Sequence, residues 1–217
     1  YNFEYYNVEE GLSQSRVNSI IQDERGHLWI GTSGGGICKF DGVNFTQYAE
    51  KDGLSGDIVS DLSEDNEGNI WITSSWGGVT RYNGRNFFTF TKKDGLIDDN
   101  NNNVVFTDSK NRVWIGSDSG LTVYKDGIFR AYDSDKKEKI GKSINEIIED
   151  SKGNIWIGTS NGISVIREDQ THHITNKDGL PSNNVTVIQE DRDGNYLIGT
   201  DKGIIKLLAG GFSNNVF

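Results

Sequence analysis

The chain has 217 residues and a mass of 24.1 kDa, which suits one domain that buries about 70% of the surface of its unfolded form. Its net charge of −10 and pI of about 4.8 disfavour binding to nucleic acid or to an anionic membrane surface, since neither would meet a basic field. No apolar run approaches the ~20 residues of a membrane-spanning helix, and one cysteine excludes an internal disulfide framework.

The 27 glycines and single proline favour many short strands joined by tight turns, and these strands follow a repeat. Five related phrases, HLWIGT, NIWITS, RVWIGS, NIWIGT and NYLIGT, centre on Trp29, Trp71, Trp114, Trp156 and Leu197, which are 42, 43, 42 and 41 residues apart. Six residues before each centre stands an aspartate, namely Asp23, Asp65, Asp108, Asp150 and Asp191. The repeat therefore fixes one register along the whole chain.

Each repeat predicts the same elements in the same order. An apolar strand such as VNSIIQD leads through a turn into the Trp strand, and the turn ends at Gly26, Gly68, Asn111, Gly153 or Gly194, as a left-handed residue requires. A third strand such as GICKF follows, and the pairs Asp41-Gly42, Asn83-Gly84 and Asp126-Gly127 predict type I′ hairpins into a fourth strand. A four-stranded antiparallel meander of this length is typical of a β-propeller blade.

The sequence thus predicts an all-β protein with a single β-propeller domain over residues 1–217. We place the five repeats at about 12–53, 54–95, 96–139, 140–179 and 180–217. Phe3 and Tyr6 precede Gly11-Leu12 as Phe45 and Tyr48 precede Gly53-Leu54, so we expect the N-terminal strand within 1–11 to complete the last blade and close a five-bladed ring. The alternatives are that 212–217 forms that strand, and that the five blades are an excised part of a larger, seven-bladed propeller.

The recurring pattern NxVxxIxEDxxGNIWIGTxxGI, followed by Tyr or Phe, DG and KDGL, resembles the two-component regulator propeller repeats from Phe3 to about Leu208. The chain departs from that pattern at Thr73, which replaces a glycine, at Leu197, at Glu168-Asp169 and in residues 134–144, which lack KDGL. The resemblance implies the extracytoplasmic, periplasmic or cell-surface, sensor region of a hybrid histidine kinase of gut bacteria. It further implies a glycan ligand and frequent homodimers, with the signalling parts outside this segment.

Ligands of propellers usually bind on the face that carries the loops between the second and third strands and the loops between blades. Trp76 lies in such a loop and is the one tryptophan outside the repeat framework, so it is a candidate platform for a sugar ring. Further polar candidates at the same face are Arg16, Asp57, Asn102, Ser143, Asn161 and Asn184. Packing within the loop and simple hydration are the competing interpretations of these side chains.

Other chemistry is weakly supported. The turns DNEG, DSKG and DRDG lack the full calcium-loop pattern, so we expect no metal and no cofactor, and GTSGGG precedes a strand rather than a phosphate-binding helix. An enzyme resembling streptogramin lyase would need a histidine near the channel, whereas His27 falls in a turn of the opposite face and His172 and His173 fall on an outer strand. The predicted function is a non-catalytic ligand sensor. A protein-interaction platform is the main alternative, and a lyase-like enzyme is the weaker one.

Overall fold

The computed structural model describes residues 2–132, 140–168 and 170–209, and its strands form five separate antiparallel sheets. The first sheet contains β1 (Val17–Gln22), β2 (Leu28–Thr32), β3 (Ile37–Phe40) and β4 (Phe45–Tyr48), and the second contains β5 (Val59–Glu64), β6 (Ile70–Ser74), β7 (Val79–Tyr82) and β8 (Phe87–Phe90). The third contains β9 (Asn102–Thr107), β10 (Val113–Ser117), β11 (Gly120–Lys125) and β12 (Ile128–Ala131). The fourth contains β13 (Ile144–Glu149), β14 (Ile155–Thr159), β15 (Gly162–Arg167) and β16 (Gln170–Ile174). The fifth contains β17 (Val185–Glu190), β18 (Tyr196–Thr200) and β19 (Gly203–Leu207).

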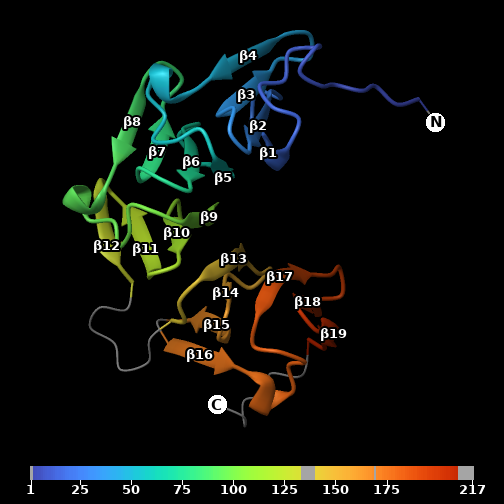
Figure 1. The fold of residues 1–217 in the computed structure, drawn as a ribbon. Helices are drawn as coiled ribbons and strands as arrows, with labels where there is room; N and C mark the ends of the chain where they lie inside the picture. The colour runs from blue at the N-terminus through green and yellow to red at the C-terminus, as the bar shows by residue number, and fades with distance from the viewer. Residues whose placement is uncertain (1, 133–139, 169, 210–217) are drawn as a thin grey trace.

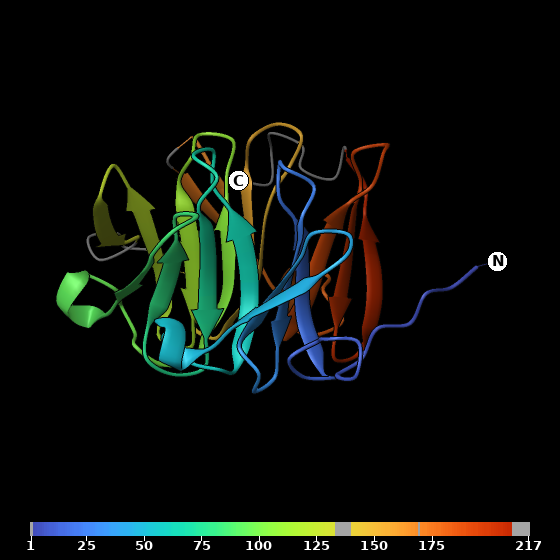
Figure 2. The same cartoon turned by 90° about the horizontal axis from the view of Figure 1, so that it is seen from above.

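The sheets stand side by side around an arc, with the first strand of each on the inside and the last on the outside (Figure 1, Figure 2). The inner strands β1, β5, β9, β13 and β17 pack on one another in chain order. Short 3-10 turns, η1 (Glu50–Asp52), η2 (Lys92–Asp94) and η3 (Asn176–Asp178), lead from an outer strand back to the next inner strand. The predicted propeller of four-stranded repeats is thereby confirmed. No helix in the described ranges has the length and apolar character needed to span a membrane.

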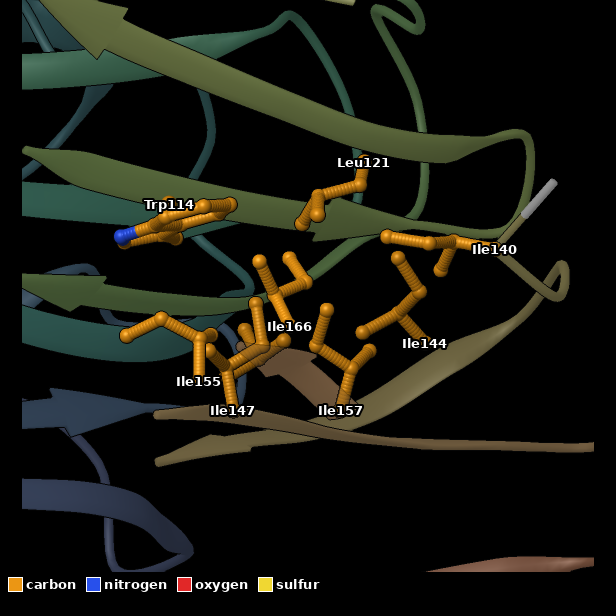
Figure 3. Close-up of a cluster of buried hydrophobic side chains, with 9 residues drawn as sticks. Trp114, Leu121, Ile140, Ile144, Ile147, Ile155, Ile157 and Ile166 are labelled. Atoms are coloured by element: carbon orange, nitrogen blue, oxygen red, sulfur yellow. The ribbon is translucent and has the colours of Figure 1, made fainter. Parts of the chain in front are cut away.

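The core is divided among the junctions between successive sheets. We call the side of a sheet that faces the following sheet its trailing face, which in the first sheet contains Trp29 and Ile37, and the opposite side its leading face. The leading face of the second sheet covers these residues with Val59, Leu62, Ile70 and Ile72. Figure 3 shows the equivalent junction in which Trp114 and Leu121 of the third sheet meet the isoleucines of the fourth. A buried tryptophan and a layer of branched side chains therefore lie in each junction.

The four framework tryptophans are buried between sheets as predicted, each at most 2% exposed. Each indole also donates a hydrogen bond to the aspartate six residues earlier, over 2.9 Å at Asp23, 2.7 Å at Asp65, 2.8 Å at Asp108 and 2.9 Å at Asp150. Burial alone would raise the pKa of Asp150, but hydrogen bonds from Asn154, Trp156 and Tyr196 outweigh it and lower that pKa. In the fifth sheet, where Leu197 replaces the tryptophan, Asp191 instead lies 2.7 Å from Lys206 Nζ.

The turn predictions hold in part. The residue that ends the first turn of each repeat has a positive φ in all five cases, including Asn111 at 57°. A two-residue hairpin with both φ values positive occurs at Asp126-Gly127, as a type I′ turn requires. The same prediction is wrong at Asp41-Gly42 and Asn83-Gly84. There the connection between the strands spans four residues. The side chain of the first of them accepts hydrogen bonds from the backbone N–H groups of the third and fourth, as Asp41 does from Val43 at 2.9 Å and from Asn44 at 2.7 Å.

The arc does not close into the expected five-bladed ring. Among the described residues, the fifth sheet does not pack on the first sheet in the way that successive sheets pack on each other. Figure 1 shows the arc open between the first and fifth sheets. The strand predicted within residues 1–11 is not observed, because residues 2–16 form no strand in the structure. The alternative strand at 212–217 lies outside the described residues. An arc of five blades is compatible with part of a larger propeller.

Candidate functional site

The loops between the second and third strands share one face of the arc with the segments that join successive sheets. Backbone hydrogen bonds link the two kinds of loop around this face, which we call the loop face: Ser33 donates to Arg16, Ser75 to Ile58, Asn101 to Ser75, Asp118 to Asn101, Ser143 to Asp118, Ser160 to Ser143 and Asp201 to Asn184. The distances of these bonds lie between 2.9 and 3.3 Å. The scaffold therefore presents the loop side chains from a fixed rim, which is where propellers usually bind ligands.

Trp76 is the largest exposed side chain of the loop face, with 60% of its surface accessible. The loop that carries it runs from 75 to 78, and the matching loop of the first sheet runs from 33 to 36, whereas only two residues join β10 to β11 and β14 to β15. The backbone around Trp76 packs tightly on the preceding segment, because a Cβ atom on Gly56 would come within 2.9 Å of the Trp76 carbonyl oxygen. The backbone of the Trp76 loop thus lies directly against Gly56, the residue before Asp57.

Arg16 and Asp57 belong to the same part of the loop face as Trp76. The Arg16 side chain is exposed, and its carbonyl accepts from Ser33, a residue that forms an isolated β-bridge with Ile58. Asp57 is half-buried, and its Oδ1 atom accepts the N–H of Glu50 at 2.8 Å. The Oδ2 atom accepts no hydrogen bond from any described residue, so one carboxylate oxygen is left for a ligand. Arg16, Asp57 and Trp76 therefore come from three adjacent segments.

Two of the remaining candidates lie apart from that group. Asn161, which is exposed, and Asn184, which is half-buried, lie together in the fourth and fifth sheets, where Gly162 N donates to the Asn183 carbonyl at 2.7 Å. Ser143 lies between the two groups and has a left-handed backbone with φ 51°. The loop face thus carries one group of candidates on its first two sheets and another on its last two.

Asn102 does not fit a ligand-binding role. Only 1% of its surface is exposed, and its Nδ2 atom donates to the carbonyls of Gly78 and Asp98 over 3.4 and 3.5 Å. It stands where other inner strands carry Val59, Ile144 or Val185, all of which are buried in the junctions between sheets. The prediction of a ligand contact is therefore corrected to a packing role between the second and third sheets.

Two carboxyl groups on inner strands were missed by the sequence reasoning. Asp61 on β5 accepts from Ser19 Oγ on β1 at 2.8 Å and from the Val105 N–H on β9 at 3.1 Å, so it links three successive strands. Burial raises the pKa of Asp61. Glu146 holds the equivalent position on β13, and burial together with the negative charge of Asp61 raises its pKa to about 7. The only signal in the sequence was a polar residue within an apolar strand, and this gave no reason to expect that Asp61 and Glu146 interact.

None of the three histidines lies at the loop face, where it could serve in acid–base chemistry. His27 lies in the turn between β1 and β2, where its Nδ1 atom is 3.0 Å from Asp23 Oδ2, while His172 and His173 lie on the outer strand β16. His173 Nδ1 is 3.0 Å from Ser164 Oγ within its own sheet. Within the described ranges, no three His, Cys, Asp or Glu side chains come close enough to hold a metal ion. What the loop face offers is a flat aromatic ring, a guanidinium group and a carboxylate oxygen, which suit binding of a polar ligand.

The sequence matches the model of the two component regulator propeller family at residues 11–34, 53–76, 139–161 and 179–202. No curated protein sequence matches the chain. Among solved structures, the chain is similar to the extracellular domain of BT3049 from B. thetaiotaomicron, a protein assigned to the hybrid two component systems, with TM-score 0.79 and 25% identity over 98% of this chain and 30% of that one. The corresponding domain of BT4673 gives TM-score 0.72 and 21% identity over 95% of this chain and 32% of that one. The chain thus spans about a third of the length of these solved relatives.

A catalytically inactive histidine-to-alanine variant of virginiamycin B lyase from Staphylococcus aureus is also similar, with TM-score 0.65 and 17% identity over 89% of this chain and 70% of that one. At this identity the likeness concerns the fold alone. The chain therefore shares its architecture both with extracellular domains of two component systems and with an enzyme. The fold does not distinguish a binding function from a catalytic one, so the side chains of the loop face must be considered.

Proposed function

Because four segments of the chain match the two component regulator propeller family, we propose that the chain is a non-catalytic, extracytoplasmic ligand-sensing domain of a two-component regulatory system. The extracellular domains of two such systems share its fold over nearly its whole length, which supports a sensing role and an extracytoplasmic location. The observation that carries the proposal is Trp76, exposed at 60% on a long, rigid loop of the face where propellers bind ligands.

The ligand is a glycan or a similar small polar molecule. Sugar rings present an apolar face that stacks on indole, and hydroxyl groups that take hydrogen bonds from charged and amide side chains. Trp76 supplies the stacking surface, while Arg16 donates to hydroxyl oxygens and Asp57 Oδ2 accepts from hydroxyl groups. Asn161 and Asn184 offer amide groups to an oligosaccharide long enough to follow the rim. A homodimer of the domain, as the family resemblance implies, belongs to the same proposal.

An interaction platform for a protein is the second candidate, because the same exposed indole and the Asp57 carboxylate suit a peptide with basic residues. A lyase-like activity is the weaker candidate, since the three histidines lie away from the loop face. The two binding functions differ in the ligand and share the site, so one binding experiment separates them.

The proposal is tested by screening plant and host oligosaccharides for a rise in melting temperature, since any ligand of the native state alone stabilises it. The strongest hit is then titrated by calorimetry into the parent chain, Trp76→Ala and Phe88→Ala. Phe88 is the matched control, because it is an exposed aromatic residue, 40% accessible, on the outer strand β8. We expect binding to weaken in Trp76→Ala and to persist in Phe88→Ala. Binding of basic peptides with no oligosaccharide hit would favour the interaction platform.

A further inference from the structure

Two asparagines of the chain stand directly before a glycine, Asn83 before Gly84 and Asn161 before Gly162. In such a pair the backbone nitrogen of the glycine can attack the side-chain carbonyl carbon of the asparagine, because a glycine carries no Cβ atom that would shield its nitrogen. Both asparagines are exposed and lie in turns, Asn83 between β7 and β8 and Asn161 between β14 and β15. The two pairs differ at the attacking nitrogen and at the carbonyl oxygen.

The attacking nitrogen is accessible in one pair and held in the other. The Gly84 N–H donates no hydrogen bond to any described residue, and Gly84 is exposed, with open space around its Cβ position. The Gly162 N–H donates to the Asn183 carbonyl at 2.7 Å. Gly162 is also buried, and a Cβ atom on it would come within 2.3 Å of the Ile174 carbonyl oxygen. The Gly162 nitrogen therefore has to leave a hydrogen bond and a packed backbone before it can react.

The carbonyl oxygen differs in the same direction. Asn83 Oδ1 accepts hydrogen bonds from the backbone N–H groups of Arg85 at 3.1 Å and of Asn86 at 2.8 Å. The bond from Arg85 closes a ring of atoms that contains both Asn83 Cγ and the Gly84 nitrogen, so the turn keeps the two reacting atoms together. The two N–H groups also point at the oxygen on which negative charge develops during an attack on Cγ, as in an oxyanion hole. Asn161 Oδ1, by contrast, accepts no hydrogen bond from any described residue.

We propose that Asn83 is a site of spontaneous deamidation that its own turn promotes. The Gly84 nitrogen gives its proton to water and forms a bond to Asn83 Cγ, while the N–H groups of Arg85 and Asn86 stabilise the charged oxygen. The bond between Cγ and Nδ2 then breaks, and the side-chain nitrogen takes up a proton from water and leaves as ammonia. The product is a cyclic succinimide. Water opens it at either of its carbonyl carbons and gives aspartate or isoaspartate, so the reaction as a whole consumes water and releases ammonia.

The two products affect the turn differently. An aspartate at position 83 repeats the turn of the first sheet, in which Asp41 accepts the same pair of backbone N–H groups at 2.9 and 2.7 Å. An isoaspartate routes the backbone through the side chain and adds a carbon atom to it. That atom falls next to the paired residues Tyr82 and Phe87, whose rings lie 4.5 Å apart. Aspartate therefore keeps the hairpin and isoaspartate loosens it. The inference is independent of the proposed ligand-binding function.

Peptide mapping by mass spectrometry tests the proposal. The chain is incubated in mildly alkaline buffer, once folded and once unfolded in guanidinium chloride, and the conversion of Asn83 and of Asn161 is followed over time. In the folded chain we expect Asn83 to convert about tenfold or more faster than Asn161, because the backbone at Gly162 has to open first. In guanidinium chloride the two sites should convert at similar rates. Equal rates in the folded chain, or slower conversion of Asn83 in the folded chain than in the unfolded one, would overturn the proposal.

Two matched variants assign the reaction to its site in the folded chain. Asn83→Asp and Asn161→Asp each remove one of the two pairs and add the same negative charge. Ion-exchange chromatography then follows the growth of a more acidic form as each chain ages. We expect this growth to stop in Asn83→Asp and to continue at the rate of the parent chain in Asn161→Asp. Growth at the parent rate in Asn83→Asp would assign the reaction to another amide and would overturn the proposal.

Discussion

Replacing Trp71 tests how much of the stability resides in the junctions between sheets. Its side chain is fully buried and lies 4.8 Å from the Tyr124 ring and 5.8 Å from the Phe90 ring. Its Nε1 atom also donates to Asp65 at 2.7 Å. Truncating a buried tryptophan to alanine costs about 3–5 kcal/mol, and the lost donor places Trp71→Ala toward the upper end. For a domain of this size, that lowers the melting temperature by roughly 6–20 °C.

The assay is urea unfolding followed by far-UV circular dichroism, because tryptophan fluorescence changes with the substitution itself. Trp71→Phe separates the two contributions. It keeps an aromatic ring in the junction and removes the donor to Asp65, a carboxylate that still accepts from the N–H groups of Glu67 and Asn69, so we expect a loss of about 1–3 kcal/mol. Trp76→Ala is the control, with an expected change within about 0.5 kcal/mol at an exposed site. Equal losses in Trp71→Ala and Trp76→Ala would refute the reasoning.

Three further predictions concern charge, backbone and catalysis. Because the pKa of Glu146 is raised to about 7 in the folded chain, the folded state binds this proton more tightly than the unfolded state, and stability is lost as pH rises from about 4.5 through 7. Glu146→Gln should therefore raise the melting temperature at pH 8 and leave it nearly unchanged at pH 5; an equal shift at both pH values would contradict this. Gly153 has φ 80°, and a Cβ atom there would meet only the Glu149 side chain, at an ordinary contact distance of 3.8 Å, so Gly153→Ala should cost about 1–2 kcal/mol in denaturant unfolding and Gly153→Asn clearly less, whereas equal costs would argue against backbone strain. Joint replacement by His27→Asn, His172→Gln and His173→Gln should leave ligand affinity within about 0.5 kcal/mol by calorimetry, and turnover that depends on any of these histidines would reveal an enzyme.

The repeated part of the fold could be predicted from the sequence because each repeat states it again. The spacing of Asp23 and Trp29 recurs with every blade, and Asn111 takes the left-handed conformation that its alignment with glycines required. The hydrogen bond between each aspartate and indole was also visible in principle, as a constant separation of six residues. In the structure the aspartate holds both the turn and the tryptophan.

What the sequence could not predict depends on which surfaces meet. Residues 2–6 have the sequence pattern of a fourth strand, but that pattern does not say which sheet the strand joins. The prediction of a closed five-bladed ring therefore rested on geometry alone. Polarity alone made Asn102 and Asp57 look alike. Only the structure shows that Asn102 is sealed between sheets, whereas Asp57 is half-buried and has one carboxylate oxygen that accepts no hydrogen bond from the described residues. The carboxyl groups of Asp61 and Glu146 come from different repeats, and their interaction follows from the arc alone.

Hydrogen exchange of the chain with and without a bound oligosaccharide tests the central claim most directly, because it maps the bound face without any substitution. We predict slower exchange at residues 55–58 and 74–78, the two segments that hold Asp57 and Trp76, with unchanged exchange at the turn that carries His27 on the opposite face. Slower exchange around His27 with no change at 55–58 and 74–78 would contradict the assignment of the ligand to the loop face.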